Sequence, residues 1–432
     1  MSAAIRTVKL NNGLTIQLKE IHTAPIISHW VWYRVGSRDE SPGQTGISHW
    51  VEHMQFKGTP QFPAGNLDKA ISREGGFWNA FTYLDWTAYF ETMPADKIDL
   101  GLALEADRMV NSLFDPQEVE SERTVIISER EGSENEPLFR LGEAVQEKAF
   151  RVHTYHHEVI GSKEDLHKIT RDDLFQHYRR YYAPSNAVVS VAGDFDSEKM
   201  LARLLELYDS LPAAPPPPRP AQAEPPASGE QWVEVSGPGE MTYLQVVYHS
   251  PPASLPDFFA CTVLDSLLAG PTSLNMFGGG GVSNKTSRLY RALVEGEYTV
   301  SVGGGMQATQ DPYLYDLSMT IHPRSHYRQA LQVLDDEIQR LQDAPVDGAE
   351  VERAIKQARA LFAYGSENIT NQAFWLGFAE MFASYAWFEN YLDALARVTP
   401  ADVQRAAQTY LAPHNRVVGV YLPTGAASEE SE

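Results

Sequence analysis

Residues 46–54 read Gly-Ile-Ser-His-Trp-Val-Glu-His-Met, and their spacing predicts an amphipathic helix. At about 100° per residue, His49, Glu52 and His53 share one face of such a helix. The opposite face is expected to pack on a core because it carries the apolar residues Ile47, Trp50, Val51 and Met54. Thr45, just before the stretch, is expected to cap the helix.

The polar face of this helix can bind a metal ion. Two imidazoles one turn apart, with a carboxylate beside them, can hold a divalent cation and leave a base next to it. The order H-x-x-E-H is the inverse of the H-E-x-x-H motif of zinc peptidases. A solvated polar face would give the same spacing, so the motif by itself leaves both interpretations open.

A second predicted helix offers the ligand that is missing. It begins at Asp115-Pro116, and Glu122 and Glu129 lie two turns apart on one of its faces. A catalytic zinc site with two histidines needs a third protein ligand plus a water, and a glutamate on a separate helix is a suitable source. The alternative is a solvated acidic face, because other glutamates flank the pair, namely Glu118, Glu120, Glu131 and Glu134.

Composition and charge limit the class of protein. With 432 residues, 43% of them hydrophobic, the chain is expected to be globular and to form two domains. The net charge of −22 argues against nucleic acid or an anionic membrane surface as a partner. No run of roughly 18 apolar residues occurs, so no membrane-spanning segment is expected. Cys261 is the lone cysteine, which fits a reducing compartment. Because the first strand is expected near Ile5, no leader peptide is expected and the cytoplasm is the expected location.

A proline-rich segment and an internal repeat divide the chain. Residues 211–231 predict a semi-rigid linker between a first domain, 1–210, and a second domain, 232–424, which precedes a disordered acidic tail, 425–432. At a constant offset of 229 residues, Thr170, Asp173, Tyr181, Ala183, Pro184, Asn186, Val188 and Val189 recur as Thr399, Asp402, Tyr410, Ala412, Pro413, Asn415, Val417 and Val418. Each set predicts a helix, a turn and a strand, so the two domains are expected to share one fold. The metal motif is not repeated.

Several other stretches have clear local signatures. A hairpin is predicted over residues 5–18 with its turn at Asn12-Gly13. The remaining expected elements are strands over 25–35, 77–82 and 87–92, a helix over 96–113 and an aromatic helix over 374–388 that packs in a core or at a domain interface. The glycine run 278–281 lacks the Lys-Ser/Thr of a phosphate-binding loop, so it is interpreted as a flexible surface loop.

The sequence resembles the M16 metallopeptidases, the inverted-motif zinc peptidases that include pitrilysin, insulin-degrading enzyme and the mitochondrial processing peptidase. The resemblance runs from residues 10–14 to residues 412–415, and the length is that of the shorter M16B subunits. It implies that His49, His53 and Glu129 bind one Zn²⁺ per chain, in the family's H-x-x-E-H and E-x6-E patterns. It also implies that Glu52 is the general base and that Glu122 orients a ligand histidine.

The resemblance also implies residues that bind the substrate. Asn79 and Ala80 match the family's edge strand, which binds a peptide backbone by strand addition. Arg291 and Tyr298, seven residues apart, match the pair that steadies the scissile carbonyl or the peptide backbone. Trp50 departs from the small or aliphatic residue expected inside the metal motif, and the glycine run is similar to the loop of a catalytically silent relative.

The implied fold is α+β, of the LuxS/MPP-like metallohydrolase type, with an antiparallel sheet flanked by helices in each of two homologous domains. The implied function is that of a zinc endopeptidase acting on unstructured peptides, with two chains closing into a chamber. Because the metal motif and the Arg/Tyr pair lie on one chain, a homodimer is expected. A heterodimer with another chain and a non-catalytic scaffold subunit remain alternatives.

Overall fold

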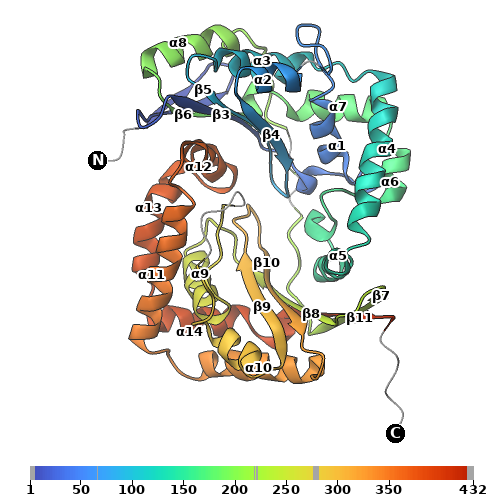
Figure 1. Cartoon of the computed structure of the whole chain (residues 1–432), viewed down its shortest axis with the longest axis vertical. Helices are drawn as coiled ribbons and strands as arrows, with labels where there is room; N and C mark the ends of the chain where they lie inside the picture. The colour runs from blue at the N-terminus through green and yellow to red at the C-terminus, as the bar shows by residue number, and fades with distance from the viewer. Residues whose placement is uncertain (1–4, 66, 218, 220–221, 276–281, 426–432) are drawn as a thin grey trace. The chain divides into compact units, whose positions relative to one another are not determined.

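The computed structural model describes residues 5–425, apart from residues 66, 218, 220–221 and 276–281. The chain forms two compact units (Figure 1). Unit 1 comprises the residues up to Arg130 together with His157–Gln222 and Glu367–Phe388, and unit 2 comprises Glu131–His156, Ala223–Ser366 and the residues from Glu389. Each unit thus combines segments from both halves of the sequence. The sequence domains 1–210 and 232–424 stay a prediction. The expected glycine loop lies outside the described residues, as does the expected acidic tail after Gly425.

Unit 1 is built on a six-stranded sheet in the order β1-β2-β6-β3-β5-β4. Its strands are β1 (Arg6–Lys9), β2 (Thr15–Glu20), β3 (Ile26–Tyr33), β4 (Phe77–Thr82), β5 (Thr87–Pro94) and β6 (Ala187–Gly193). Neighbouring strands are antiparallel except β2 and β6, which run parallel. The predicted hairpin is confirmed, since β1 pairs with β2 and Gly13 adopts φ +96° in the turn, a conformation that suits glycine.

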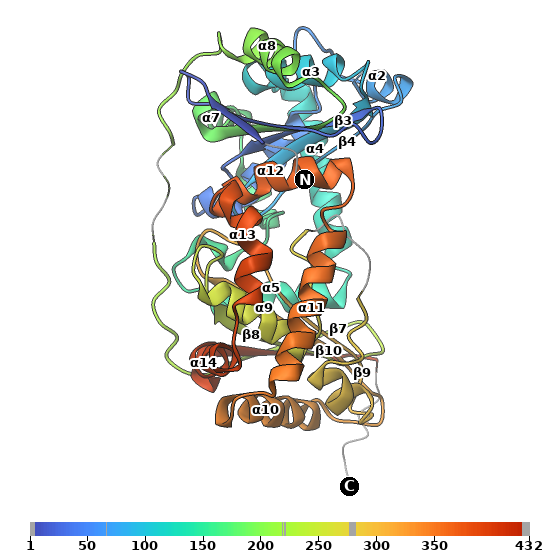
Figure 2. The ribbon, with the colours of Figure 1, turned by 90° about the vertical axis from the view of Figure 1, so that its left-hand side faces the viewer.

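Helices cover both faces of this sheet (Figures 1 and 2). Helix α12 (Ile369–Phe382) packs against β3 and β6, while α3 (Asp99–Asn111) and α8 (Ser197–Tyr208) lie on the opposite face. The other helices that begin in this unit before the linker are α1 (Ile47–Met54), α2 (Leu67–Arg73), α4 (Pro116–Ser133), α6 (Lys163–Lys168) and α7 (Arg171–Tyr181).

Aromatic rings fill the contact between α12 and the sheet. Trp32 and Phe374 meet edge to face with their ring centroids 5.3 Å apart. Gly377 lets the helix approach closely, because a Cβ atom at this position would lie 2.1 Å from Nε1 of Trp32. The predicted core packing is therefore confirmed. The prediction of a single continuous helix over 374–388 is wrong. Helix α12 ends at Phe382, and a second helix, α13 (Tyr385–Ala396), begins three residues later. The Glu380 carboxylate accepts the N–H of Tyr385 at 2.9 Å at this start.

Unit 2 is built on a five-stranded sheet in the order β7-β11-β8-β10-β9. Its strands are β7 (Gln231–Gly237), β8 (Tyr243–Ser250), β9 (Thr299–Met306), β10 (Tyr313–Ile321) and β11 (Arg416–Pro423), and only β7 and β11 run parallel. Helix α5 (Pro137–Ala149) packs on β7, β8 and β11. Among the described residues, four further α-helices lie wholly within this unit and α13 lies largely within it; the four are α9 (Asp257–Leu268), α10 (Tyr327–Asp343), α11 (Gly348–Tyr364) and α14 (Pro400–Tyr410).

The internal repeat corresponds to a repeated structure. Helices α7 and α14 begin in the same way, because the hydroxyls of Thr170 and Thr399 each accept an aspartate N–H at 3.2 Å. Each helix then ends in a turn where an asparagine side chain, Asn186 or Asn415, donates to a tyrosine carbonyl, at 2.9 and 2.8 Å respectively. A strand follows in both cases, β6 or β11, so the prediction of one fold for both halves is confirmed at these elements.

The two units also exchange equivalent helices. Helix α5 begins at residue 137 and α12 at residue 369, which is 232 residues later and close to the repeat offset. Helix α5 comes from the first half of the sequence and covers the sheet of unit 2, whereas α12 comes from the second half and covers the sheet of unit 1. The predicted α+β class is confirmed, with one parallel strand pair in each sheet. None of the helices in the described part of the chain has the length and apolar character needed to cross a lipid bilayer.

Candidate metal centre

Helix α1 places the H-x-x-E-H residues as the sequence predicts. The residues on its apolar face are buried, namely Ile47, Trp50, Val51 and Met54. The predicted Thr45 cap is wrong, because Gly46 occupies the cap position at φ +88° and offers no side chain. The Glu40 carboxylate instead accepts the N–H groups of Gly46 at 2.8 Å and of Ser48 at 2.9 Å. Thr45 turns away and donates its hydroxyl to Asp165 at 2.7 Å.

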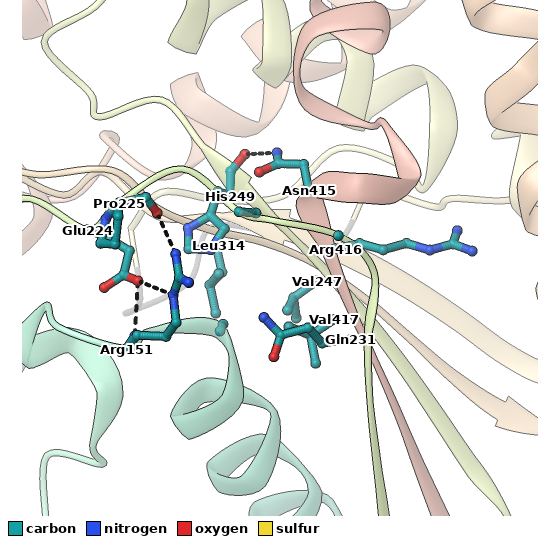
Figure 3. Close-up of a pocket in the computed structure, with 13 residues that line it drawn as sticks. Arg151, Glu224, Pro225, Gln231, Val247, His249, Leu314, Asn415, Arg416 and Val417 are labelled. Atoms are coloured by element: carbon teal, nitrogen blue, oxygen red, sulfur yellow. Dashed lines mark hydrogen bonds and ion pairs between the residues drawn. The ribbon is translucent and has the colours of Figure 1, made fainter.

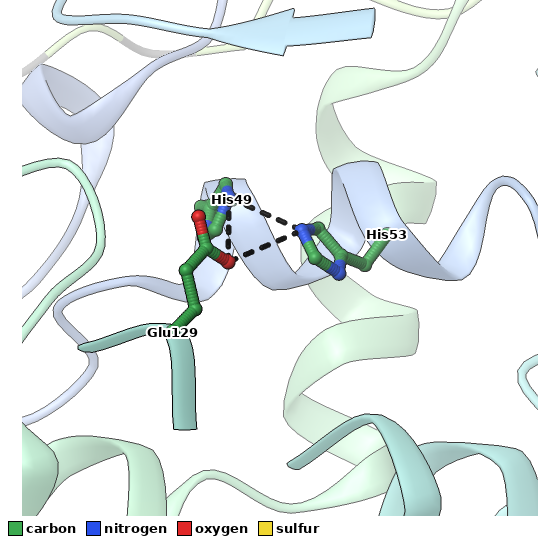
Figure 4. Close-up of side chains that lie close together, drawn as sticks. All are labelled: His49, His53 and Glu129. Carbon is green, nitrogen blue, oxygen red and sulfur yellow. Dashed lines mark hydrogen bonds and ion pairs between the residues drawn. The ribbon is translucent and has the colours of Figure 1, made fainter. Parts of the chain in front are cut away.

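Three side chains from two helices converge beside α1 (Figure 4). The Nε2 atoms of His49 and His53 lie 3.2 Å apart. Oε2 of Glu129, from α4, lies 3.9 Å from Nε2 of His49 and 3.8 Å from Nε2 of His53. Among the described residues this is the group of histidine, cysteine and acidic side chains that offers three ligand atoms close together.

This triangle fits a zinc ion. Zinc bonds to nitrogen and oxygen of 2.0–2.2 Å in a tetrahedron put neighbouring ligand atoms about 3.3–3.6 Å apart. The three observed separations bracket this range, so small side-chain movements suffice for coordination. The donor set of two imidazoles and one carboxylate is also one that zinc accepts in catalytic sites, where the fourth position stays open.

Glu122 holds His53 in the orientation needed for binding. Nδ1 of His53 donates to Oε1 of Glu122 at 2.8 Å, which leaves the lone pair of Nε2 facing His49 and Glu129. Nζ of Lys57 lies 2.5 Å from the other oxygen of Glu122. Burial opposes ionisation of this carboxyl, but the hydrogen bonds from His53 and Lys57 prevail and lower its pKa.

The two histidines respond differently to their surroundings. Burial lowers the pKa of His49 to about 3, and the neighbouring His53 adds to the effect. His49 is thus held as the neutral imidazole that a metal ion requires. Burial also opposes protonation of His53, but the hydrogen bond to Glu122 and the nearby carboxylates prevail and raise its pKa.

Glu52 is buried beside the ligand triangle. The residue is 7% exposed, and burial raises the pKa of its carboxyl to about 7. Its Oε2 accepts a hydrogen bond from Oγ1 of Thr82 at 2.6 Å. A carboxylate with a pKa near neutrality is suited to take up and release a proton.

Two residues of this arrangement escaped the sequence reasoning. Lys57 follows the end of α1 and contacts Glu122 on α4, so the period of the first helix did not mark it. Thr82 was not marked either, because its approach to Glu52 depends on the pairing of β4 with β5 and on the packing of α1 against β4.

The predicted substrate strand lies at the edge of its sheet. Asn79 and Ala80 belong to β4, the last strand in the order, which pairs with β5 on one side. Oδ1 of Asn79 accepts the N–H of Ala80 at 2.9 Å. Arg291 and Tyr298 belong to unit 2, in the short helix over Tyr290–Val294 and just before β9, and their part in the centre stays a prediction.

The pocket in Figure 3 belongs to unit 2 and is lined in part by residues of the linker, among them Glu224 and Pro225. Its volume is about 10 Å³, which is room for no more than a single water. The Glu224 carboxylate accepts the N–H groups of Arg151, Val152 and His153 at 2.9–3.0 Å. These bonds fasten this segment of the linker to the residues that follow α5.

Comparisons with known proteins identify relatives of both halves. The family model described as insulinase (peptidase family M16) matches residues 15–163, and the one described as peptidase M16 inactive domain matches residues 168–358. An uncharacterized zinc protease of Streptomyces coelicolor is 26% identical over 96% of this chain and 89% of its own length. The zinc protease PqqE of Helicobacter pylori is 32% identical over 61% of this chain and 60% of its own length.

A solved structure has the same fold over nearly all of the chain. The crystal structure of a protease from Helicobacter pylori superposes with a TM-score of 0.90 at 25% identity, covering 98% of this chain and 100% of that one. The inverted motif, the convergence of His49, His53 and Glu129, and both family models agree with this match. The chain belongs to peptidase family M16.

Proposed function

We propose that this protein is a zinc-dependent endopeptidase that hydrolyses peptides or unstructured polypeptides. The observation that carries the proposal is the triangle of His49, His53 and Glu129, with a buried carboxylate, Glu52, beside it. The names of relatives as zinc proteases support zinc as the metal.

The roles of the residues follow from their chemistry. Zinc, when bound, supplies a positive charge that acidifies a water and polarises the scissile carbonyl. Glu52 takes the proton from the attacking water and delivers it to the nitrogen of the leaving amine, so it returns to its starting state at the end of each turnover. Glu122 keeps the Nε2 lone pair of His53 directed at the metal.

Substrate binding is assigned by the family resemblance. Asn79 and Ala80 on the edge strand β4 would add the peptide backbone as a further strand. Arg291 and Tyr298 would steady the carbonyl oxygen or the peptide backbone. We also propose that two copies of the chain form a chamber, since the ligand set and this pair occur on the same chain. A cytoplasmic location is part of the same proposal.

The test is a peptide digest with a matched variant. Purified protein is incubated with a mixed peptide library, with and without a chelator, and the products are identified by mass spectrometry. We expect zinc-dependent internal cuts, and we expect Glu52→Gln to retain zinc but to lose nearly all hydrolysis, by about 10²–10⁴-fold. An unchanged rate in Glu52→Gln would remove Glu52 from the mechanism.

The second candidate function is a non-catalytic M16 subunit, either a scaffold or the partner of another chain. The observation behind this candidate is that residues 168–358 match the model described as the M16 inactive domain. Metal analysis of the purified protein separates the two, because a scaffold would carry no zinc. Light scattering addresses assembly, and a monomer under all conditions would contradict the proposed homodimer.

A further inference from the structure

The contact between Glu52 and Thr82 joins the candidate base to the candidate substrate strand. Thr82 is the last residue of β4, and its Oγ1 lies 2.6 Å from Oε2 of Glu52. This separation is in the short range of hydrogen bonds from a hydroxyl to an ionised carboxylate. An ionised carboxylate can only accept, so the hydroxyl is the donor.

A second hydroxyl supports the first. Thr87 is the register partner of Thr82 on β5, and the two Oγ1 atoms lie 3.3 Å apart. The Thr87 hydroxyl donates to the carbonyl oxygen of Val35 at 2.9 Å. Each hydroxyl has a single proton to donate. Thr82 donates its proton to Glu52, and Thr87 donates its proton to the carbonyl of Val35. The arrangement fixes the direction in which Thr82 donates.

The hydrogen bond makes the two oxygens of Glu52 unequal. The hydroxyl of Thr82 holds Oε2 whether the other oxygen, Oε1, is bare or carries a proton, because a carboxylic acid keeps one oxygen that accepts. The carboxyl group is therefore kept in one orientation while a proton arrives at Oε1 and leaves again. Thr82 is the hydrogen-bond partner that the structure describes for this buried side chain.

We propose that Thr82 is a positioning residue, whose hydroxyl fixes Oε2 of Glu52 so that strand β4 sets the place of the proton-carrying carboxylate. The same strand carries Asn79 and Ala80, three and two residues before Thr82, where the peptide would be added. A single rigid element would thus fix the distance between the scissile bond and the base. This inference rests on the proposed peptidase function.

The test compares substitutions that keep or remove the hydroxyl. Thr82→Val retains the shape of the side chain and loses the donor, whereas Thr82→Ser retains the donor. We expect Thr82→Val to lower kcat by about tenfold to a hundredfold, with KM changed by no more than about threefold and with zinc content and zinc affinity unchanged. Thr82→Ser is expected to keep most of the wild-type kcat.

A matched control reports the purely structural cost of losing a threonine hydroxyl from this sheet. Thr92, on β5, bonds to the hydroxyls of Ser28 and Thr370 at 2.9 Å and makes no described contact with Glu52. Thr92→Val is expected to shift the unfolding temperature as Thr82→Val does, and to leave kcat close to that of the wild type. Equal losses of kcat in the two variants would reduce Thr82 to a structural role.

A readout independent of activity completes the test. In crystal structures of the zinc-loaded proteins, we expect the Glu52 carboxyl to keep one orientation in Thr82→Ser and to turn or split into alternate conformers in Thr82→Val. An unmoved Glu52 and an unchanged kcat in Thr82→Val would overturn the inference while leaving the peptidase proposal intact. If the wild type proves inactive, the orientation of Glu52 in these structures still decides whether Thr82 positions it.

Discussion

Replacing Glu122 by glutamine should weaken zinc binding without removing a ligand. The variant keeps an oxygen that can accept Nδ1–H of His53, at the position where the native carboxylate accepts it at 2.8 Å. What is lost is the negative charge between His53 and Lys57. The glutamine amide nitrogen would also face the Lys57 ammonium, a donor against a donor.

The size of the effect follows from these contacts. A hydrogen bond to a charged acceptor contributes about 1.5–3 kcal/mol and one between neutral groups about 0.5–1.5 kcal/mol, so the exchange costs roughly 1–1.5 kcal/mol. Lys57 would retain only Glu118 as a described ion-pair partner, at 3.7 Å, which adds to the loss. The exchange of the hydrogen bond alone corresponds to about a 5- to 13-fold increase in the zinc Kd. With the loss at Lys57 added, we expect Glu122→Gln to raise the Kd by about tenfold to a hundredfold, as removal of such supporting groups does elsewhere.

The assay is a titration of the apo-protein with zinc in competition with a chromophoric chelator. The matched control is Glu118→Gln, which removes the weaker contact to Lys57 but leaves the bond between Glu122 and His53. It should change the Kd by no more than about twofold, since an exposed ion pair contributes little. A zinc Kd for Glu122→Gln that equals that of this control would refute the reasoning.

Two further predictions concern the stability of unit 1. Gly377→Ala would push a methyl group into Trp32 Nε1, so we expect a loss of about 3 kcal/mol in the free energy of unfolding, measured by urea titration with intrinsic fluorescence; an unchanged midpoint would show that α12 can shift without cost. His177 is buried, and burial lowers its pKa from 6.5 to about 3, with Arg180 adding to the effect. Between about pH 6.5 and pH 3 the unfolded chain binds a proton at His177 more readily than the folded protein does. The contribution of the neutral His177 to stability is therefore complete above about pH 6.5 and declines as the pH falls toward 3, by about 1.4 kcal/mol per pH unit. Urea titrations from pH 7 to 4.5 should show this slope reduced by that amount in His177→Gln, and identical slopes in the two proteins would contradict the assignment.

Local patterns predicted much of the site from the sequence. The 3.6-residue period of α1 put His49, Glu52 and His53 on one face, and the seven-residue spacing of Glu122 and Glu129 put both on one side of α4. The period of a helix is a property of the backbone, so it survives any tertiary context. That Glu129 reaches the histidines was implied by family resemblance, and the structure brings the three together.

Contacts between elements were harder to predict. The cap of α1 depends on Gly46 and on Glu40, whose carboxylate arrives from outside the helix, so the usual preference for threonine at this position misled the prediction. Thr82 reaches Glu52 only through strand register and the packing of α1 on β4. The aromatic stripe of α12 indicated burial, but nothing in it specified that the sheet it covers belongs to the other half of the sequence.

That exchange of helices has a consequence for synthesis of the protein. The last strand of the first sheet, β6, ends at Gly193, while α12 begins at Ile369, which is 176 residues later. At about 5–20 residues per second, a ribosome needs roughly 9–35 s to cover this distance. During that interval the sheet face that carries Trp30 and Trp32 is not yet covered by α12. The nascent chain in this state exposes apolar surface and can aggregate. A protein truncated at the proline-rich segment would lack α12, so this sheet face would stay uncovered. We therefore expect the first half to remain in solution only when the second half is present, on the same chain or co-expressed.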